Sequence, residues 1–416
     1  MFGVYANAWK VKDIRRKLLY VLLVLLIFRI GSTIPLPGID MAALRELMFG
    51  VDTGIIGMIV GGEQGTIFAM GIGPYITASI IMQLLTVAVP KLEQLKKEGE
   101  EGRKKINQYT RVLAVIMAVL QASGTVFSQR GAFTHPNFFV YFVAALTMIA
   151  GTMFIMWMSE LLTEKAIGNG ASFIIFANIL AALPMGFMTL YEASLGTIWN
   201  AITVIAIIFI FVAIVAFAVL VADGQRKIPV QYSKKMVGRQ MYGGQSSFIP
   251  VKVNIAGVMS IIFSMSILGF PMQLAMFFPD TEWLRTASHF LAITHPLGAV
   301  LYVILIFCFT FFYTSFAVNP VEMAENLKKN GGFIPGIRPG RPTSDYIART
   351  VNRMSWIGAV CYSIIAIIPV VVEWTLGVEV GFGGTTLLIV VGVALELVKQ
   401  LESQLLMRNY KGFLGN

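Results

Sequence analysis

The side chains that most often carry chemistry are scarce in the apolar part of this chain. The three histidines, His135, His289 and His295, fall in loops between apolar segments and form no HExxH or Cys/His pattern. Cys308 and Cys361 lie inside apolar runs, where a cysteine usually behaves as a small core residue. No glycine-rich phosphate loop precedes a Lys-Ser/Thr pair. The sequence therefore predicts no enzyme, no cofactor and no metal site.

The apolar segments contain isoleucines at helical spacing in place of catalytic or metal-binding side chains. Ile76 and Ile80 are four residues apart, as are Ile175 and Ile179, so each pair lies on one helix face. Small and polar residues interrupt the segment 66–88: Gly71, Gly73, Pro74, Thr77, Ser79 and Gln83. A lipid-facing helix needs none of these, which favours a helix facing other helices or a water-filled cavity. Tight packing in a helix bundle would also explain them.

The composition requires a membrane to surround these elements. The chain is 56% hydrophobic and 13% charged, against about 25% charged residues in soluble domains. A bilayer core about 30 Å thick takes about 20 apolar residues per helix. Segments of this kind recur along the chain and predict an all-α polytopic membrane protein. Its ten expected spans are 18–34, 66–88, 108–128, 138–159, 170–190, 201–222, 254–276, 296–318, 354–373 and 383–401.

The placement of positive charge predicts the orientation. With the N-terminus in the cytosol, cytosolic segments hold 27 of the 32 Lys and Arg residues. Both termini are then cytosolic. Ten spans divide into two sets of five, 1–190 and 191–416, and an odd number per set means that the halves are inverted relative to each other. A central site between the halves is the usual consequence.

Charged residues inside the spans are few. Arg29 lies near the outer end of the first span and is expected to reach the membrane surface or a partner. Glu396 and Lys399, three residues apart, can pair on one face of the last helix. Ion-coupled transporters usually place Asp, Glu or His at the bilayer midplane. Their absence counts against a transporter.

Three segments depart from the simple pattern of spans. Residues 53–62 are apolar but too short to cross a membrane, and are expected either to plug the bundle or to lie on its outer surface. The loop 223–253 contains KIPVQY and SFIPVKV, two alternating stretches that predict a β-hairpin with a basic tip. In the loop 319–353, Gly and Pro fix a turn around Arg338. Both loops are long enough to predict a docking surface.

Six stretches, spread along the whole length of the chain, resemble a known protein family. The resemblance lies in FRIGSTIPLPGID (28–40), GPYITASI (73–80), KKEGEEGRKKINQYTR (96–111), GNGASFIIFA (168–177), VNPVEMAENLKKNGGFIPGIRPG (318–340) and GGTTLLIVVGVALE (383–396). These stretches are similar to the SecY/Sec61-alpha family of protein-conducting channel subunits. The resemblance implies a channel that passes unfolded polypeptides across the membrane and releases transmembrane segments sideways into lipid.

The resemblance also implies roles for individual residues. An apolar pore ring would consist of Ile76, Ile80, Ile175, Ile179, Ile262 and Ile389, and a plug would include Gly54, Ile55, Ile56, Gly57, Met58 and Ile59. A lateral gate would open between the second and seventh spans at Thr77, Ser79, Gln83, Ser266 and Phe270. Arg239 and Arg338 would dock the ribosome or the SecA ATPase. Gln240 stands where the family often has a second basic residue, which would weaken that contact.

The implied partners are the small membrane subunits SecE and SecG, SecA, the ribosome, membrane lipid and polypeptides that carry a signal sequence. The implied location is the bacterial cytoplasmic membrane. A ring of isoleucines suits this function because it offers a passing chain no hydrogen bond and no charge, and an empty apolar constriction dewets. A small-solute secondary transporter with broken helices is the alternative from another class. It would need convergent polar contacts in place of the ring.

Overall fold

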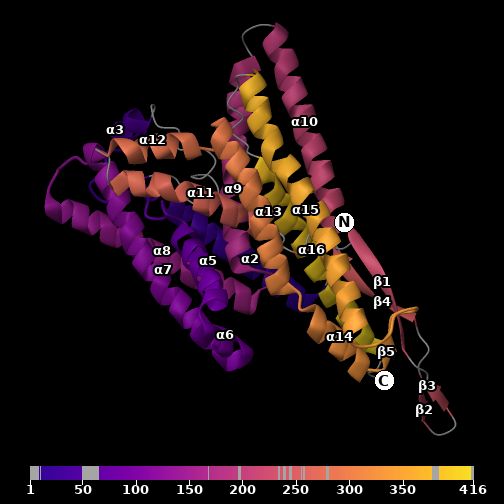
Figure 1. Cartoon of the computed structure of the whole chain (residues 1–416). Coiled ribbons are helices and arrows are strands. Elements are labelled where there is room, and N and C mark those ends of the chain that lie inside the picture. Colours follow the sequence, from indigo (N-terminus) through magenta and orange to yellow (C-terminus); the bar gives the residue numbers. More distant parts are fainter. Residues whose placement is uncertain are drawn as a thin grey trace.

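The computed structural model is mostly helical, with a few short strands at one side (Figure 1). It describes residues 9, 11–48, 65–166, 168–194, 198–232, 235–237, 240–242, 246–253, 255, 258–277, 281–376 and 384–413. The N-terminal half contains α2 (Lys12–Thr33), α3 (Met41–Met48), α5 (Gly73–Ala88), α6 (Pro90–Lys97), α7 (Glu100–Ser128), η1 (Arg130–Ala132), α8 (Phe138–Lys165) and α9 (Gly170–Ser194). The C-terminal half contains α10 (Ile198–Asp223), β1 (Gln225–Tyr232), β2 (Lys235–Val237), β3 (Gln240–Tyr242), β4 (Ser246–Lys252), α11 (Met259–Phe277), α12 (Glu282–Leu291), α13 (Pro296–Ala317), α14 (Pro320–Lys329), β5 (Gly332–Phe333), α15 (Arg341–Leu376) and α16 (Gly384–Phe413).

Each predicted span contains a helix among the described residues, but the number of membrane crossings stays a prediction. Among the described residues, five helices are long and apolar enough to cross a membrane, or six if the bent pair α5 and α6 forms one span. Gly170–Pro184 and Met259–Ala275 are apolar but shorter. The chain is a helical membrane protein, and its arrangement in ten spans rests on the sequence.

The predicted second span is wrong in its first third, because residues 66–72 are not helical. The stretch instead pairs with the end of the first span, with an isolated bridge between Pro35 and Thr66. The helix α5 begins only at Gly73, with Pro74 in its first turn, where the missing N–H has no partner to lose. The chain turns again after Ala88, and α6 lies at 98° to α5.

Two glycines hold the turn before α5 against its neighbours. The Phe68 ring stacks between Phe28 of α2, at 5.9 Å, and Phe154 of α8, at 6.0 Å. A Cβ added at Gly31 would meet the Phe68 ring, and one at Gly151 would meet the Ile67 carbonyl. Both helices can approach the turn only because these positions lack a side chain. The start of α5 is therefore fixed between α2 and α8.

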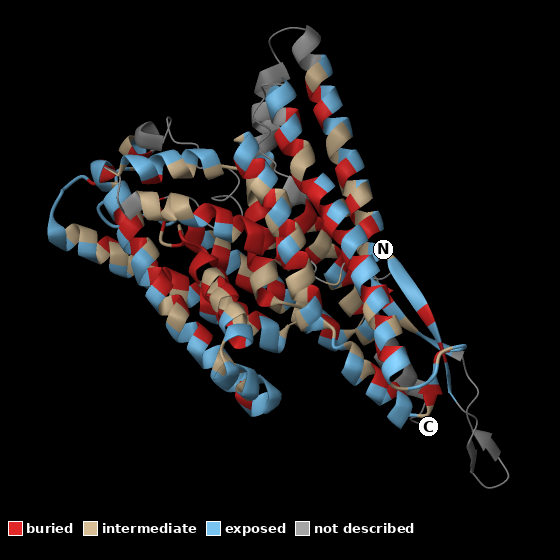
Figure 2. Ribbon diagram, in the orientation of Figure 1, coloured by how far each residue is buried: buried red, intermediate tan, exposed pale blue. Residues whose placement is uncertain are grey.

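Buried side chains gather where the helices meet, and the outer faces of the bundle are exposed (Figure 2). The largest buried cluster takes residues from α2, α5, α8, α9, α10, α11, α13, α15 and α16. The outer faces are also apolar: Leu22 is 57% exposed, Leu26 63% and Phe209 75%. A surface of this kind needs an apolar solvent, which a bilayer supplies.

The predicted β-hairpin is present and belongs to a larger sheet. Strand β1 pairs antiparallel with β4, with Ile228 opposite Ile249. Strand β5, from the loop 319–353, adds to the other edge of β1 through Gln231 and Phe333. A small second hairpin, β2 and β3, extends beyond this sheet (Figure 1). The two large loops therefore form one unit.

Candidate functional site

The six ring isoleucines lie together in the largest buried cluster of the protein. They come from four helices: Ile76 and Ile80 from α5, Ile175 and Ile179 from α9, Ile262 from α11 and Ile389 from α16. All six are buried, with exposures between 0% and 9%. Two of these helices come from each half of the chain. Residues far apart in the sequence thus belong to one buried apolar cluster.

The surroundings of this centre contain no buried charge in the part of the chain that the structure describes. None of its buried side chains is Asp, Glu, Lys, Arg or His. Among the polar neighbours, Gln83, Asn178 and Thr386 each stand three residues from one of these isoleucines on the same helix. Each has a buried side-chain atom with no hydrogen-bond partner. The centre therefore has some unused hydrogen-bonding capacity and no fixed charge.

The predicted gate residues form contacts within their own helices. Gln83 donates through Nε2 to Ser79 Oγ at 3.3 Å, and Thr77 donates to the Gly73 carbonyl at 3.1 Å, both within α5. In α11, Ser266 donates to the Ile262 carbonyl at 2.8 Å. Phe270, also in α11, is 46% exposed. No hydrogen bond joins the two sets among the described residues.

The third predicted span, α7, supplies a polar contact to α11 instead. The two helices pack together, and Gln121 of α7 donates through Nε2 to Gln273 Oε1 of α11 at 3.3 Å. Both side chains are partly buried. A second contact between the halves lies nearer the predicted cytosolic side, where Lys96 of α6 lies over the Phe316 ring of α13, 3.2 Å from its centroid.

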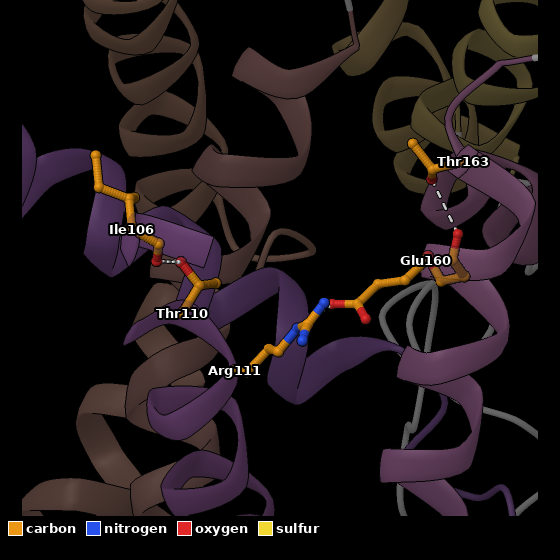
Figure 3. Close-up of polar contacts among 6 residues, drawn as sticks. Ile106, Thr110, Arg111, Glu160 and Thr163 are labelled. Atoms are coloured by element: carbon orange, nitrogen blue, oxygen red, sulfur yellow. Dashed lines mark hydrogen bonds and ion pairs between the residues drawn. The ribbon is translucent and has the colours of Figure 1, made fainter. Parts of the chain in front are cut away.

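An ion pair joins the predicted third and fourth spans. Arg111 of α7 donates through Nε to Glu160 of α8 at 2.7 Å, and the two side chains point toward each other across the gap between the helices (Figure 3). Along the same helices, Thr110 and Thr163 bond to carbonyls one turn earlier, Ile106 and Ser159. The charge of Arg111 inside its span is thus balanced within the N-terminal half.

The geometry of Arg338 agrees with the turn expected from the sequence. Gly336 and Gly340 both have positive φ, 80° and 103°, which glycine adopts without strain. The Arg338 side chain is exposed, and its carbonyl accepts a bond from Thr343 Oγ1 at 2.8 Å. The turn is anchored to the first turn of α15, so the guanidinium stands out from a fixed backbone.

The unit that the two large loops form, and that carries this turn, has a core of its own. Ile228, Val230 and Val251 of the sheet pack with Ile334, close to Arg338, and with Ile347 of α15. The strands present alternate side chains to this core, as the period of a strand requires. The turn around Arg338, which the sequence predicts to be a docking site, is therefore supported by both large loops.

Comparison with known proteins places these observations in a family. The family model described as SecY matches residues 66–398. The chain belongs to the SecY family. A protein translocase subunit SecY from Streptomyces scabiei is 45% identical, and the match covers 100% of both chains. The SecY subunit from Halalkalibacterium halodurans is 43% identical, again over 100% of both chains.

Solved structures agree on the fold. A protein-conducting channel matches with a TM-score of 0.65 and 18% identity, over 92% of this chain and 91% of that one. Sec61 in the canine ribosome–channel complex from the endoplasmic reticulum matches with a TM-score of 0.61 and 17% identity, over the same shares. At this identity the likeness establishes the fold alone.

Several residues predicted from the resemblance to SecY proteins lie outside the described residues. They are the plug, residues 53–62 with Gly54, Ile55, Ile56, Gly57, Met58 and Ile59, and the docking residue Arg239. The backbone of Gln240 is described, as the start of β3. These assignments stay predictions, with the SecY family as their basis.

Two smaller expectations of the sequence are wrong. Lys399 does not pair with Glu396 but with Asp223 at the end of α10, at 2.7 Å, and it also donates to the Ala222 carbonyl. A cation at a helix C-terminus meets favourable carbonyl dipoles, which Glu396 cannot offer. Cys308 is exposed, so it is not the core residue that the sequence predicts. Cys361 is half-buried and packs against the largest buried cluster, in agreement with the prediction, and both cysteines are free thiols.

Proposed function

We propose that this chain is the channel subunit through which unfolded polypeptides cross a membrane. The observation that carries the proposal is the buried apolar cluster to which both halves contribute isoleucines, in a chain 45% identical over its length to a SecY translocase subunit. A polypeptide in transit presents every kind of side chain. A centre without buried charge binds none of them strongly.

The pore ring would be Ile76, Ile80, Ile175, Ile179, Ile262 and Ile389. It would lie at the waist of an hourglass pore between two inverted halves, 1–190 and 191–416. Residues 53–62 would close the outer funnel. A solved SecY protein whose plug domain is described as stabilising the closed state and maintaining a membrane seal matches this fold with a TM-score of 0.67. In the resting channel the ring would exclude water and ions by dewetting.

The lateral gate would open where the two halves separate, beside the ring. Thr77, Ser79 and Gln83 on α5 would form one wall, and Ser266 and Phe270 on α11 the other. The contact of Gln121 with Gln273 supports adding α7 to the first wall. An apolar signal helix or transmembrane segment would leave through this opening, since its transfer into lipid is favourable.

Docking would take place on the cytosolic unit, through Arg239 and Arg338. An exposed guanidinium on a fixed turn suits bidentate contact with a carboxylate of SecA or a phosphate of ribosomal RNA. The small membrane subunits SecE and SecG would complete the complex. We place it in the bacterial cytoplasmic membrane with both termini in the cytosol, because nearly all Lys and Arg residues then lie inside.

Reconstitution tests this function. Vesicles containing the chain with its small subunits should import a signal-bearing precursor when SecA and ATP are supplied, and the imported fraction becomes protected from protease. A small-solute secondary transporter is disfavoured by the lack of buried charge among the described residues. Solute uptake without any import of precursor would reverse this conclusion.

A further inference from the structure

The contact between Lys96 and Phe316 joins helix α6 of the N-terminal half to helix α13 of the C-terminal half. Lys96 lies near the end of α6, which packs against α5 and α7 of its own half. Its ammonium reaches the other half and lies 3.2 Å from the centroid of the Phe316 ring. Phe316 is at the end of α13, which is the predicted cytosolic end of that span. The contact therefore bridges the inner end of the proposed side opening.

Lys96 contacts the Phe316 ring, whereas a carboxylate on its own helix is engaged by another lysine. Glu93 pairs with Lys97, one helical turn away, at 2.7 Å. Among the described residues no ion pair includes Lys96. Partial burial lowers the pKa of Lys96, and Glu93 opposes this shift. A cation that gives up water for a ring face is attracted by the quadrupole of the ring.

The surroundings of Phe316 favour a cation. The Tyr313 ring lies beside it, 6.4 Å between centroids. Glu396 of α16 accepts a hydrogen bond from Gln400 at 3.2 Å and has no ion pair among the described residues. Phe316 is half-exposed, so a visiting side chain can reach it once Lys96 leaves.

We propose that the ring face of Phe316 binds a basic side chain from the N-terminal part of a signal sequence, and that Lys96 occupies this site while the channel is idle. The inference rests on the proposed function. A signal sequence carries a positively charged segment ahead of its apolar segment, and basic residues stay on the cytosolic side. When the apolar segment enters the side opening, its basic segment is left beside the inner end of α13. Its cation takes the place of Lys96 and releases α6 from the other half.

The test compares two forms of one precursor, with two lysines or two glutamines ahead of the apolar segment. Import into vesicles is measured for the wild-type complex and for complexes carrying Phe316→Leu or Phe316→Tyr. The wild type should import the lysine form about two- to fivefold faster, the factor expected of an exposed cation–π contact. Phe316→Leu should abolish this preference and Phe316→Tyr should keep it. Phe312→Leu, one helical turn away, is the matched control and should keep it too.

The lysine is tested in the same assay. Lys96→Gln should speed import of the glutamine form about two- to fivefold, because the contact that holds α6 is lost. Lys96→Arg should leave it unchanged, and so should the control Lys91→Gln, which changes an exposed lysine at the other end of α6. A benzophenone amino acid in place of Phe316 should crosslink to the basic segment of a stalled precursor.

An unchanged lysine preference in Phe316→Leu would overturn this inference, as would crosslinks that avoid the basic segment. Failure of the wild-type complex to import either form would instead count against the proposed function.

Discussion

The hydrogen bond between Gln121 and Gln273 should help hold the side opening shut. At 3.3 Å and partly buried, it falls at the weak end of side-chain hydrogen bonds, about 0.5–1 kcal/mol. Its loss should shift the balance between closed and open channel about two- to fivefold. Gln121→Leu also leaves the Gln273 amide without its partner in the closed state, so the single change should exceed this range. The double change to leucine removes both groups and should restore much of the closed state.

The assay is import of a precursor with a shortened apolar signal segment, which a tightly closed channel rejects. Each single variant should raise the protease-protected fraction, and the double variant should raise it less. Thr125→Val is the control on the same helix, because the Thr125 hydroxyl bonds to the Gln121 carbonyl of α7 itself. Equal import by wild type and both single variants would refute the reasoning. So would a double variant that exceeds the singles.

Three further predictions concern the docking turn, the ring and the turn before α5. Arg338→Glu should sharply lower SecA-driven import at unchanged protein level, with Arg338→Lys intermediate; normal import by the Glu variant would remove Arg338 from the docking site. Ile80→Ala should make the resting complex leak ions in planar bilayers, whereas Ile306→Ala, a change at another buried isoleucine, should not. Equal leaks from the two variants would mean that the ring isoleucines only pack the core and have no gating role. Gly31→Ala should destabilise the protein by about 1–3 kcal/mol by forcing the Phe68 ring aside, seen as a lower melting temperature; an unchanged melting temperature would contradict that packing.

Much of the helical fold could be predicted from the sequence because each predicted span corresponds to a continuous stretch of apolar residues. The hairpin of β1 and β4 was predictable for the same reason, since alternation and turn residues are local signals. The sequence wrongly predicted that the second helix extends over residues 66–72, although a local signal against this was present. Gly71, Gly73 and Pro74 interrupted the run, and the structure turns there instead of continuing as a helix.

The side-chain contacts between helices could not be predicted from the sequence. Gln121 and Gln273 are 152 residues apart, and whether they meet depends on how two helices are rotated and packed. The same holds for Lys96 over Phe316, for Lys399 with Asp223, and for the strand β5 that joins the two large loops. The grouping of the isoleucines came from family resemblance. Their burial in one cluster is consistent with it, while their role in the pore stays a proposal.

The central claim is that a polypeptide passes through the isoleucine ring. The direct measurement is disulfide crosslinking of a precursor stalled in transit, with one cysteine in the precursor and one at Ile80, Ile179 or Ile389 of the channel, in a background with Cys308 and Cys361 replaced by serine. The account predicts crosslinks from all three ring positions and none from Ile306, which is buried in the same cluster without belonging to the ring. Normal import with crosslinks at Ile306 and none at the ring would contradict it.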